Sequence, residues 1–335
     1  MGGCFGTEDL KPECGKENLN PETSRLEKLR PEVNRAETEK NSIGKYKVLR
    51  LLGEGGEGSV YLARDEDLQR MAAVKHLGKS RREAEWLQKL EHPMLPVIYE
   101  LLWDESWYLV MEYIRGITLR RYIDENGYAC EEQVCTWIEQ LLDVTEYLHT
   151  MKPPVIYRDF KPDNIIVCPD GHIRLVDFGA AVLRNYGSQD HIVMAVTQGY
   201  AAPEQLGLTG IGAYADERSD IYALGKVLYY MMTGADPAKP PYASLPVQDY
   251  QPFVSKKLER VIRKCMEEDP AQRYRSAEEV RTHLRKCKKR KYGLQRRHFI
   301  RGVEKKVWLT EMQEEICYYP YRRDYLNRNV NRNNE

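Results

Sequence analysis

A glycine-rich segment at 53–58 limits the possible folds of this 335-residue chain more than any other sequence feature. Residues typical of β-strands run into it over 46–52 and out of it over 59–63, so the segment is predicted to be the turn of an antiparallel hairpin. A strand after the glycines argues against a dinucleotide-binding fold, in which a helix follows. Because glycine has no Cβ atom, backbone amides in this turn can approach phosphate groups closely.

Further β-type runs follow the glycine turn and predict a small antiparallel sheet. The predicted strands are 46–52, 59–63, 71–75, 97–102 and 107–111. Between the third and fourth strands, residues 81–90 have helical periodicity and end before His92-Pro93. We therefore expect a lobe over residues 43–114 with five strands and one helix.

After Gly116 the pattern becomes mainly helical. Helices are predicted over 119–125, 131–150, 219–233, 255–267 and 276–290. Two short β-type runs, 165–167 and 173–176, flank Pro169-Asp170-Gly171, which is a hairpin signal. The expected fold class is α+β, with a second, larger and mainly helical lobe over 115–290.

Composition and charge exclude several classes of protein. Lys plus Arg and Asp plus Glu both number 51, so the overall charge gives no argument for nucleic acid or membrane as a partner. No run of about 18 apolar residues could span a membrane. The eight cysteines show no metal-binding spacing, which favours a reducing, cytoplasmic location.

The two ends of the chain differ from its middle. Residues 1–42 have few apolar positions and are predicted to be a disordered arm, while 291–335 form a basic and aromatic extension. Gly2 and Cys4 are candidate lipidation sites, set against an unmodified start. The basic stretch 281–306 has two interpretations: a solvated surface, or a docking site for an acidic partner. No specific nucleic acid is predicted.

Four more motifs follow the glycine turn in a fixed order. They are Ala73-Val74-Lys75, then Tyr157-Arg158-Asp159 with Asn164, then Asp177-Phe178-Gly179, then Ala202-Pro203-Glu204. Together with the glycines, this ordered set resembles the protein kinase family over roughly 46–287. The resemblance implies two lobes with ATP bound between them.

The resemblance assigns nucleotide contacts to the small lobe and to the segment that follows it. Lys75 would pair with the α and β phosphates and with Glu83, Glu85 being the alternative partner, because a buried ammonium needs an opposite charge. The backbone near Glu112 and Ile114 would bind adenine. The implied nucleotide-binding residues are Gly53, Gly55, Gly58, Val60, Ala73, Lys75, Glu112 and Ile114.

The resemblance also assigns the chemistry of phosphate transfer. Asp159 would orient the acceptor hydroxyl and take its proton, and Lys161 would neutralise the transferring phosphate. Asn164 and Asp177 would bind Mg²⁺ through oxygen atoms. Tyr157 replaces the histidine that is usual in this motif, at a position expected to serve packing.

Other residues are expected to support or regulate this site. Asp220 resembles the buried aspartate that holds the catalytic-loop backbone, and Arg273 resembles the ion-pair partner of Glu204. If a phosphate orders the activation segment, Ser188 is the candidate site. The alternative is a segment already ordered by Asp190.

The implied function is a serine/threonine protein kinase of bacterial type that phosphorylates protein substrates, including itself. Lys161 and Thr197 favour serine and threonine acceptors over tyrosine. A pseudokinase that binds nucleotide as a scaffold is the alternative. A small-molecule kinase is a third interpretation, although such enzymes typically lack the Ala202–Glu204 segment and its arginine partner.

Overall fold

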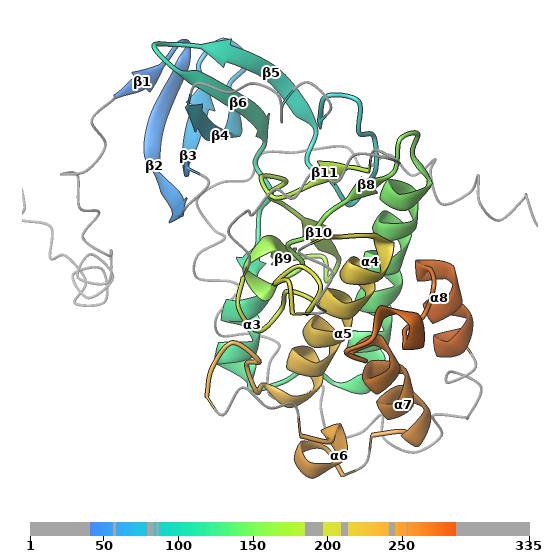
Figure 1. The fold of residues 1–335 in the computed structure, drawn as a ribbon. Coiled ribbons are helices and arrows are strands. Elements are labelled where there is room, and N and C mark those ends of the chain that lie inside the picture. The colour runs from blue at the N-terminus through green and yellow to red at the C-terminus, as the bar shows by residue number, and fades with distance from the viewer. Residues whose placement is uncertain are drawn as a thin grey trace, which may run out of the picture.

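The computed structural model describes residues 41–55, 58–78, 84, 87–184, 197–208, 214–240, 245–252 and 254–285. Within them, a lobe built around one β-sheet lies against a larger lobe that is mainly helical (Figure 1). The predicted two-lobed α+β fold is confirmed.

The small lobe contains one antiparallel sheet in the order β1-β2-β3-β4-β6-β5. Its strands are β1 (Ser42–Ile43), β2 (Tyr46–Gly55), β3 (Gly58–Asp65), β4 (Arg70–Gly78), β5 (Ile98–Trp103) and β6 (Trp107–Glu112). All five predicted strands are present, and β1 is a sixth that the sequence did not indicate. Ser42 belongs to the predicted disordered arm, yet it lies in β1 and pairs with Lys47 of β2. Its neighbour Ile43 is buried against the sheet.

Half of the predicted helix over 81–90, namely residues 81–83, 85 and 86, lies outside the described residues. Ala84, Leu87 and Leu90 are described and all three are buried in the main core. Their spacing agrees with the apolar face that the sequence predicted.

The large lobe contains the helices and three short strand pairings. The helices are α3 (Leu119–Asn126), α4 (Glu131–Thr150), α5 (Glu217–Thr233), α6 (Val247–Tyr250), α7 (Lys256–Cys265) and α8 (Ala277–Arg285), with 3₁₀ turns η1 (Pro162–Asn164) and η2 (Pro270–Gln272). The strands are β7 (Ile117–Thr118), β8 (Val155–Ile156), β9 (Ile165–Val167), β10 (Ile173–Leu175) and β11 (Val182–Leu183). Of these described elements, the helix α6 and the short strands β7, β8 and β11 were not predicted. No helix in the described part of the chain combines the length and apolar character that a membrane span requires.

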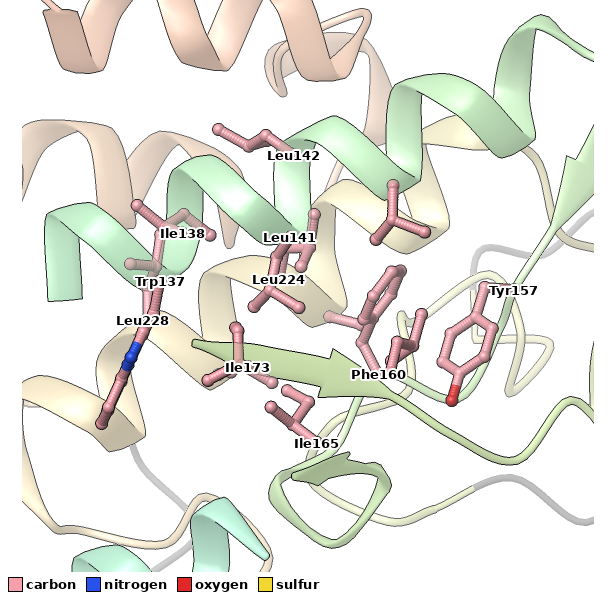
Figure 2. Packing of buried hydrophobic residues seen from close by; sticks show 14 of the residues in the cluster. Trp137, Ile138, Leu141, Leu142, Tyr157, Phe160, Ile165, Ile173, Leu224 and Leu228 are labelled. Atoms are coloured by element: carbon pink, nitrogen blue, oxygen red, sulfur yellow. The ribbon is translucent and has the colours of Figure 1, made fainter. Parts of the chain in front are cut away.

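The core of the large lobe forms where α4, α5 and the β9–β10 hairpin meet. Figure 2 shows Ile138 and Leu141 of α4 and Leu224 of α5 close to Ile165 and Ile173 of the hairpin. Nearby, the indole N–H of Trp137 donates to the carbonyl oxygen of Gly171 at 2.9 Å, which fixes the hairpin turn against α4. The catalytic loop ends directly before β9, and Asp177 follows shortly after β10. The core that holds this hairpin therefore also positions these two parts of the site.

The basic stretch 281–306 is described only as far as Arg285, within α8. Its first member, Arg281, is buried and contacts Glu146 on α4 as well as Glu278. The charge of Arg281 therefore serves the fold, and any docking role falls to the rest of the stretch.

Candidate active site

A cleft of about 400 Å³ opens between the two lobes. The structure brings eight of the predicted site residues to its walls: Gly53, Val60, Ala73, Lys75, Glu112, Ile114, Asn164 and Asp177. They come from β2, β3, β4 and β6, from the segment after β6, and from the catalytic loop and the end of the hairpin. Residues far apart in sequence thus line one cavity large enough for a nucleotide.

The other two predicted glycines close the turn at the edge of the cleft. Gly55 at the end of β2 pairs with Gly58 at the start of β3, and residues 56 and 57 lie outside the described part. Gly58 has φ of +113°, and a Cβ atom there would lie 2.3 Å from the carbonyl oxygen of His76. Only glycine fits this position, because a side chain would be both strained and in collision.

Lys75 lies on β4 and is only 3% exposed. Its Nζ atom is 2.8 Å from Oδ1 of Asp177. Glu83, the predicted second partner, lies outside the described residues. Burial by itself would raise the pKa of Asp177, but the Lys75 ammonium and the backbone N–H of Gly179 outweigh it, so the pKa is lowered and the carboxylate stays ionised.

Glu112 at the end of β6, with Tyr113 and Ile114 directly after it, lines the cleft. The Glu112 carboxylate accepts a hydrogen bond of 2.7 Å from Arg174 and another of 3.2 Å from the N–H of Val97. This side chain is therefore held by groups of the protein, which leaves the main chain of Glu112 as the part that a ligand could contact. Met111 borders both the cleft and a smaller cavity behind it, which Phe178 also lines.

Asp159 is the most connected carboxylate of the catalytic loop. Its Oδ1 accepts from the Thr197 hydroxyl at 2.8 Å, and its Oδ2 lies 2.6 Å from the Lys161 ammonium. The Asn164 amide also donates to Oδ2, at 2.7 Å. These contacts fix the orientation of a carboxylate that could accept a proton from a hydroxyl placed beside it.

A buried aspartate of α5, which is contacted by a histidine of α4, holds the backbone of the catalytic loop. Asp220 is fully buried and accepts the backbone N–H groups of Tyr157 and Arg158 at 2.9 and 2.8 Å. The Nε2 atom of His149 lies 2.8 Å from the same carboxylate. The role that the resemblance implied for Asp220 is thus seen in the geometry.

Tyr157 stacks between the catalytic loop and the segment that carries Asp177. Its ring centroid is 5.1 Å from that of Phe178, and its hydroxyl donates to the carbonyl oxygen of Val176 at 2.6 Å. The tyrosine therefore serves packing, as expected, and adds a hydrogen bond to the residue directly before Asp177.

Glu204 and Arg273 form the predicted ion pair in the large lobe. Both side chains are fully buried and are joined by two hydrogen bonds of 2.7 and 2.8 Å. Ser219 on α5 donates a third hydrogen bond to Glu204 at 2.7 Å. This network connects the end of the activation segment to the first turn of α5.

Asn164 and Asp177 fit a Mg²⁺ site by the chemistry of their donors. The amide nitrogen of Asn164 is engaged by Asp159, so its carbonyl oxygen is the atom available to a cation. Asp177 is ionised and lines the same cleft. Two protein oxygens suit Mg²⁺, which takes its other ligands from phosphates and water. Among the described residues, no group of three or more His, Cys, Asp and Glu forms a metal-binding cluster.

The sequence did not indicate several apolar residues that line the cleft. Leu52 lies on β2 directly before Gly53, Ile166 lies on β9, and Val176 directly precedes Asp177. Ile166 could have been found, because it stands two residues after Asn164 in a strand whose other residues, Ile165 and Val167, are buried.

Several candidate regulatory positions cannot be placed. Ser188 and Asp190 of the activation segment, and Gly2 and Cys4 at the N-terminus, lie outside the described residues. The described part of the activation segment resumes at Thr197, which contacts Asp159.

Comparisons with known proteins agree with this geometry. The protein kinase domain family matches residues 46–284. Serine/threonine-protein kinase PrkC of Bacillus subtilis is 33% identical over 270 residues, covering 73% of this chain and 41% of PrkC. Serine/threonine-protein kinase D of Synechocystis is 33% identical over 267 residues, covering 70% and 51%, and PknB of Mycolicibacterium smegmatis is 32% identical over 270 residues, covering 72% and 42%.

These alignments span about two fifths to one half of each relative's length. The family match covers well over half of the present chain and includes every motif that lines the cleft. The chain therefore belongs to the protein kinase family and is similar to these bacterial serine/threonine-protein kinases.

Proposed function

We propose that this chain transfers the γ-phosphate of ATP to serine and threonine hydroxyls of protein substrates, including its own. The observation that carries the proposal is the arrangement of Asp159, whose carboxylate contacts Thr197, Lys161 and Asn164 at 2.8, 2.6 and 2.7 Å. An aspartate oriented in this way is suited to accept a hydroxyl proton. The similarity to bacterial serine/threonine kinases supports the class of acceptor.

The transfer follows from the positions of the side chains. The acceptor oxygen forms a bond to the γ-phosphorus while the bond from that phosphorus to the β–γ bridging oxygen breaks, which releases ADP. Asp159 accepts the hydroxyl proton, and Lys161, next to it, offsets negative charge on the transferring group. Positioning and charge compensation account for most of the catalysis in this class of reaction.

Nucleotide binding would use the walls of the cleft. Lys75 is placed to meet phosphate oxygens, and apolar side chains such as Val60 and Ile166 enclose the base from two sides. Asn164 and Asp177 would hold Mg²⁺, which supplies positive charge to the β and γ phosphates when bound.

The remaining assignments are also proposals. The kinase domain is taken as 43–290, between the N-terminal arm 1–42 and the C-terminal extension 291–335. A reducing cytoplasmic location also stays a proposal, which rests on the spacing of the cysteines in the sequence. An acidic partner for the basic stretch stays a prediction.

Labelled ATP with Mg²⁺ and a generic basic protein tests the activity. We expect phosphoserine and phosphothreonine with little phosphotyrosine, and we expect Asp159→Asn and Lys75→Met to abolish nearly all transfer. The matched controls are Asp170→Asn, in an exposed turn, and Lys47→Met, on the exposed side of β2; both should retain wild-type rates. Nucleotide binding by the wild-type protein without any transfer would support the scaffold alternative instead.

A further inference from the structure

Arg120, the second residue of α3, joins two carboxylates from separate parts of the large lobe. Its Nε donates to Oδ1 of Asp163 at 2.7 Å and its Nη1 donates to Oδ2 of Asp236 at 2.6 Å. Asp163 belongs to the catalytic loop, one residue before Asn164, whereas Asp236 follows α5. The Arg120 side chain is 24% exposed and that of Asp236 only 6%. An arginine placed in this way is a structural bridge, since guanidinium donors match two acceptors at once.

Asp236 in turn holds the end of the activation segment. The buried Tyr200 donates its hydroxyl proton to Oδ1 of Asp236 at 3.0 Å. Gly199, with φ of +86°, packs so closely that a Cβ atom would lie 2.5 Å from the backbone of Ala238. Two independent contacts therefore seat the turn at 197–200 on the segment that follows α5.

These contacts close into a ring around the acceptor side of Asp159. From Asp159 the ring passes to Thr197, along the turn to Tyr200, across to Asp236 and through Arg120 to Asp163. It closes because Asn164, the neighbour of Asp163, donates back to Asp159. Arg120 is the member that connects the two halves, because it alone of these residues contacts both Asp163 and Asp236 among the contacts described.

The electrostatics of the ring agree with a bridge that stays formed near neutral pH. Burial would raise the pKa of Asp236, but the Ala238 N–H, Arg120 and the Tyr200 hydroxyl outweigh it and lower the pKa. Burial would lower the pKa of Arg120, but its two carboxylate partners outweigh this effect and raise the pKa. Asp236 and Arg120 are therefore both ionised near neutral pH.

We propose that Arg120 is a positioning residue for the protein acceptor: it keeps the 197–200 turn on the catalytic loop and so keeps Thr197 against Asp159. The inference rests on the kinase activity proposed above and adds a residue that none of the sequence motifs contains. Asp163 also lines the cleft, but Arg120 itself does not, and its other partner Asp236 holds the 197–200 turn, so Arg120 should affect acceptor use far more than nucleotide binding.

Arg120→Met tests the bridge, and Arg281→Met is the matched control. Arg281 is also a largely buried arginine among carboxylates, but it joins α8 to α4 away from the cleft. We expect Arg120→Met to lower kcat/KM for a peptide acceptor by roughly tenfold to a hundredfold, the cost of misplacing reacting groups by about 1 Å, while the Kd for ATP stays within about twofold. Arg281→Met should lower stability and leave kcat/KM for the peptide near wild type.

Two further variants separate the loss of the bridge from the loss of side-chain charge and volume. Arg120→Lys keeps the charge but cannot bridge two carboxylates with a planar fork, so it should fall between wild type and Arg120→Met. Tyr200→Phe removes one hydrogen bond of the ring. If the two residues act through the same ring, the double variant loses less than the product of the single losses.

Hydrogen exchange gives a readout that needs no activity. The backbone N–H groups of Tyr200 and Ala201 donate to the carbonyl oxygen of Thr197. Arg120→Met should speed hydrogen exchange at these two amides and leave exchange of the α4 amides unchanged. Any of three results for Arg120→Met would overturn the proposal. They are a kcat/KM for the peptide no lower than that of Arg281→Met, a parallel loss of ATP affinity, and unchanged hydrogen exchange at residues 200–201. If the wild-type protein transferred no phosphate, the proposed function would fail, and the exchange experiment would still decide whether Arg120 holds the turn.

Discussion

Two ion pairs in this protein join distant segments but are held very differently. Glu204 and Arg273 lie fully buried in the large lobe, with two hydrogen bonds between them and a third from Ser219. Lys75 and Asp177 meet through a contact of 2.8 Å at the cleft, where the Asp177 side chain is still 32% exposed. The first pair is enclosed by the protein on all sides, whereas the second lines a cavity.

The difference indicates what each pair is for. A fully buried pair contributes little net stability compared with apolar residues, yet loss of one partner leaves an uncompensated charge inside the protein. A pair at a cavity wall can exchange its partner for a ligand at small cost, because solvent and phosphate can replace the missing contact. We therefore expect Glu204 and Arg273 to matter mainly for folding, and Lys75 and Asp177 mainly for turnover.

The largest effect on stability is expected from Glu204→Gln. It leaves the Arg273 guanidinium buried without an opposite charge, so the free energy of unfolding should fall by about 3–5 kcal/mol. Urea denaturation measures the loss. The control is Glu278→Gln, which also faces an arginine but has a half-exposed side chain and should cost less than about 1 kcal/mol. Equal losses in the two variants would remove the distinction between buried and accessible pairs.

A smaller loss is expected from Asp220→Asn. An amide has only one acceptor oxygen, so it cannot accept the N–H groups of both Tyr157 and Arg158 on separate oxygens as Asp220 does. Breaking one charge-assisted hydrogen bond should cost about 1.5–3 kcal/mol and lower the Tm, which calorimetry measures. Asp170→Asn, in an exposed turn, should leave the Tm unchanged. A Tm equal to wild type in Asp220→Asn would show that the loop does not depend on this anchor.

Lys75→Met should have a still smaller effect on stability and a far larger one on activity. Methionine keeps most of the apolar stem, and Asp177 can turn to solvent in the cleft, so the free energy of unfolding should change by no more than about 1 kcal/mol. Urea denaturation run beside the transfer assay separates the two effects. A loss as large as that of Glu204→Gln would mean that the cleft pair is also a folding element.

The smallest effect concerns pH. The pKa of Asp177 is lowered in the folded protein, so its contribution to stability is present above the unfolded value of about 3.9 and is lost as the pH falls through the lowered value. Since solvent reaches the carboxylate, this contribution should be less than about 1 kcal/mol. Unfolding free energies of wild type and Asp177→Asn, measured from pH 6 to 3, should therefore converge at the acid end. Parallel curves would contradict the lowered pKa.

The sequence predicted best those elements whose signal is a motif of short, fixed spacing or a strong hydrophobic periodicity. Helix α4 begins and ends where the 131–150 pattern predicted, because its apolar face is continuous over five turns. The β9–β10 hairpin and the charged residues of the cleft also follow from local patterns. Strand β1 was not predicted, because it has only two residues, Ser42 and Ile43, and two residues carry no periodicity.

Contacts between distant residues that belong to no motif were not indicated by the sequence. Arg120 and Asp236 are separated by 116 positions, and neither belongs to a motif. Asp163 does lie in the catalytic loop, but at a position that the motif leaves variable. Only the packing of α3 against η1, together with the chain that follows α5, places these three side chains together.

Arg281 also bears on how far the chain can be shortened. It stands near the end of the described residues, and Glu139, Asp143 and Glu146 of α4 all lie within 4 Å of its guanidinium. A truncation that stopped before residue 281 would leave three carboxylates along one face of α4 without this cation, and their mutual repulsion would act on the helix that supports the catalytic hairpin. We therefore expect the smallest stable fragment of this chain to include Arg281, which lies beyond the last residue of any catalytic motif.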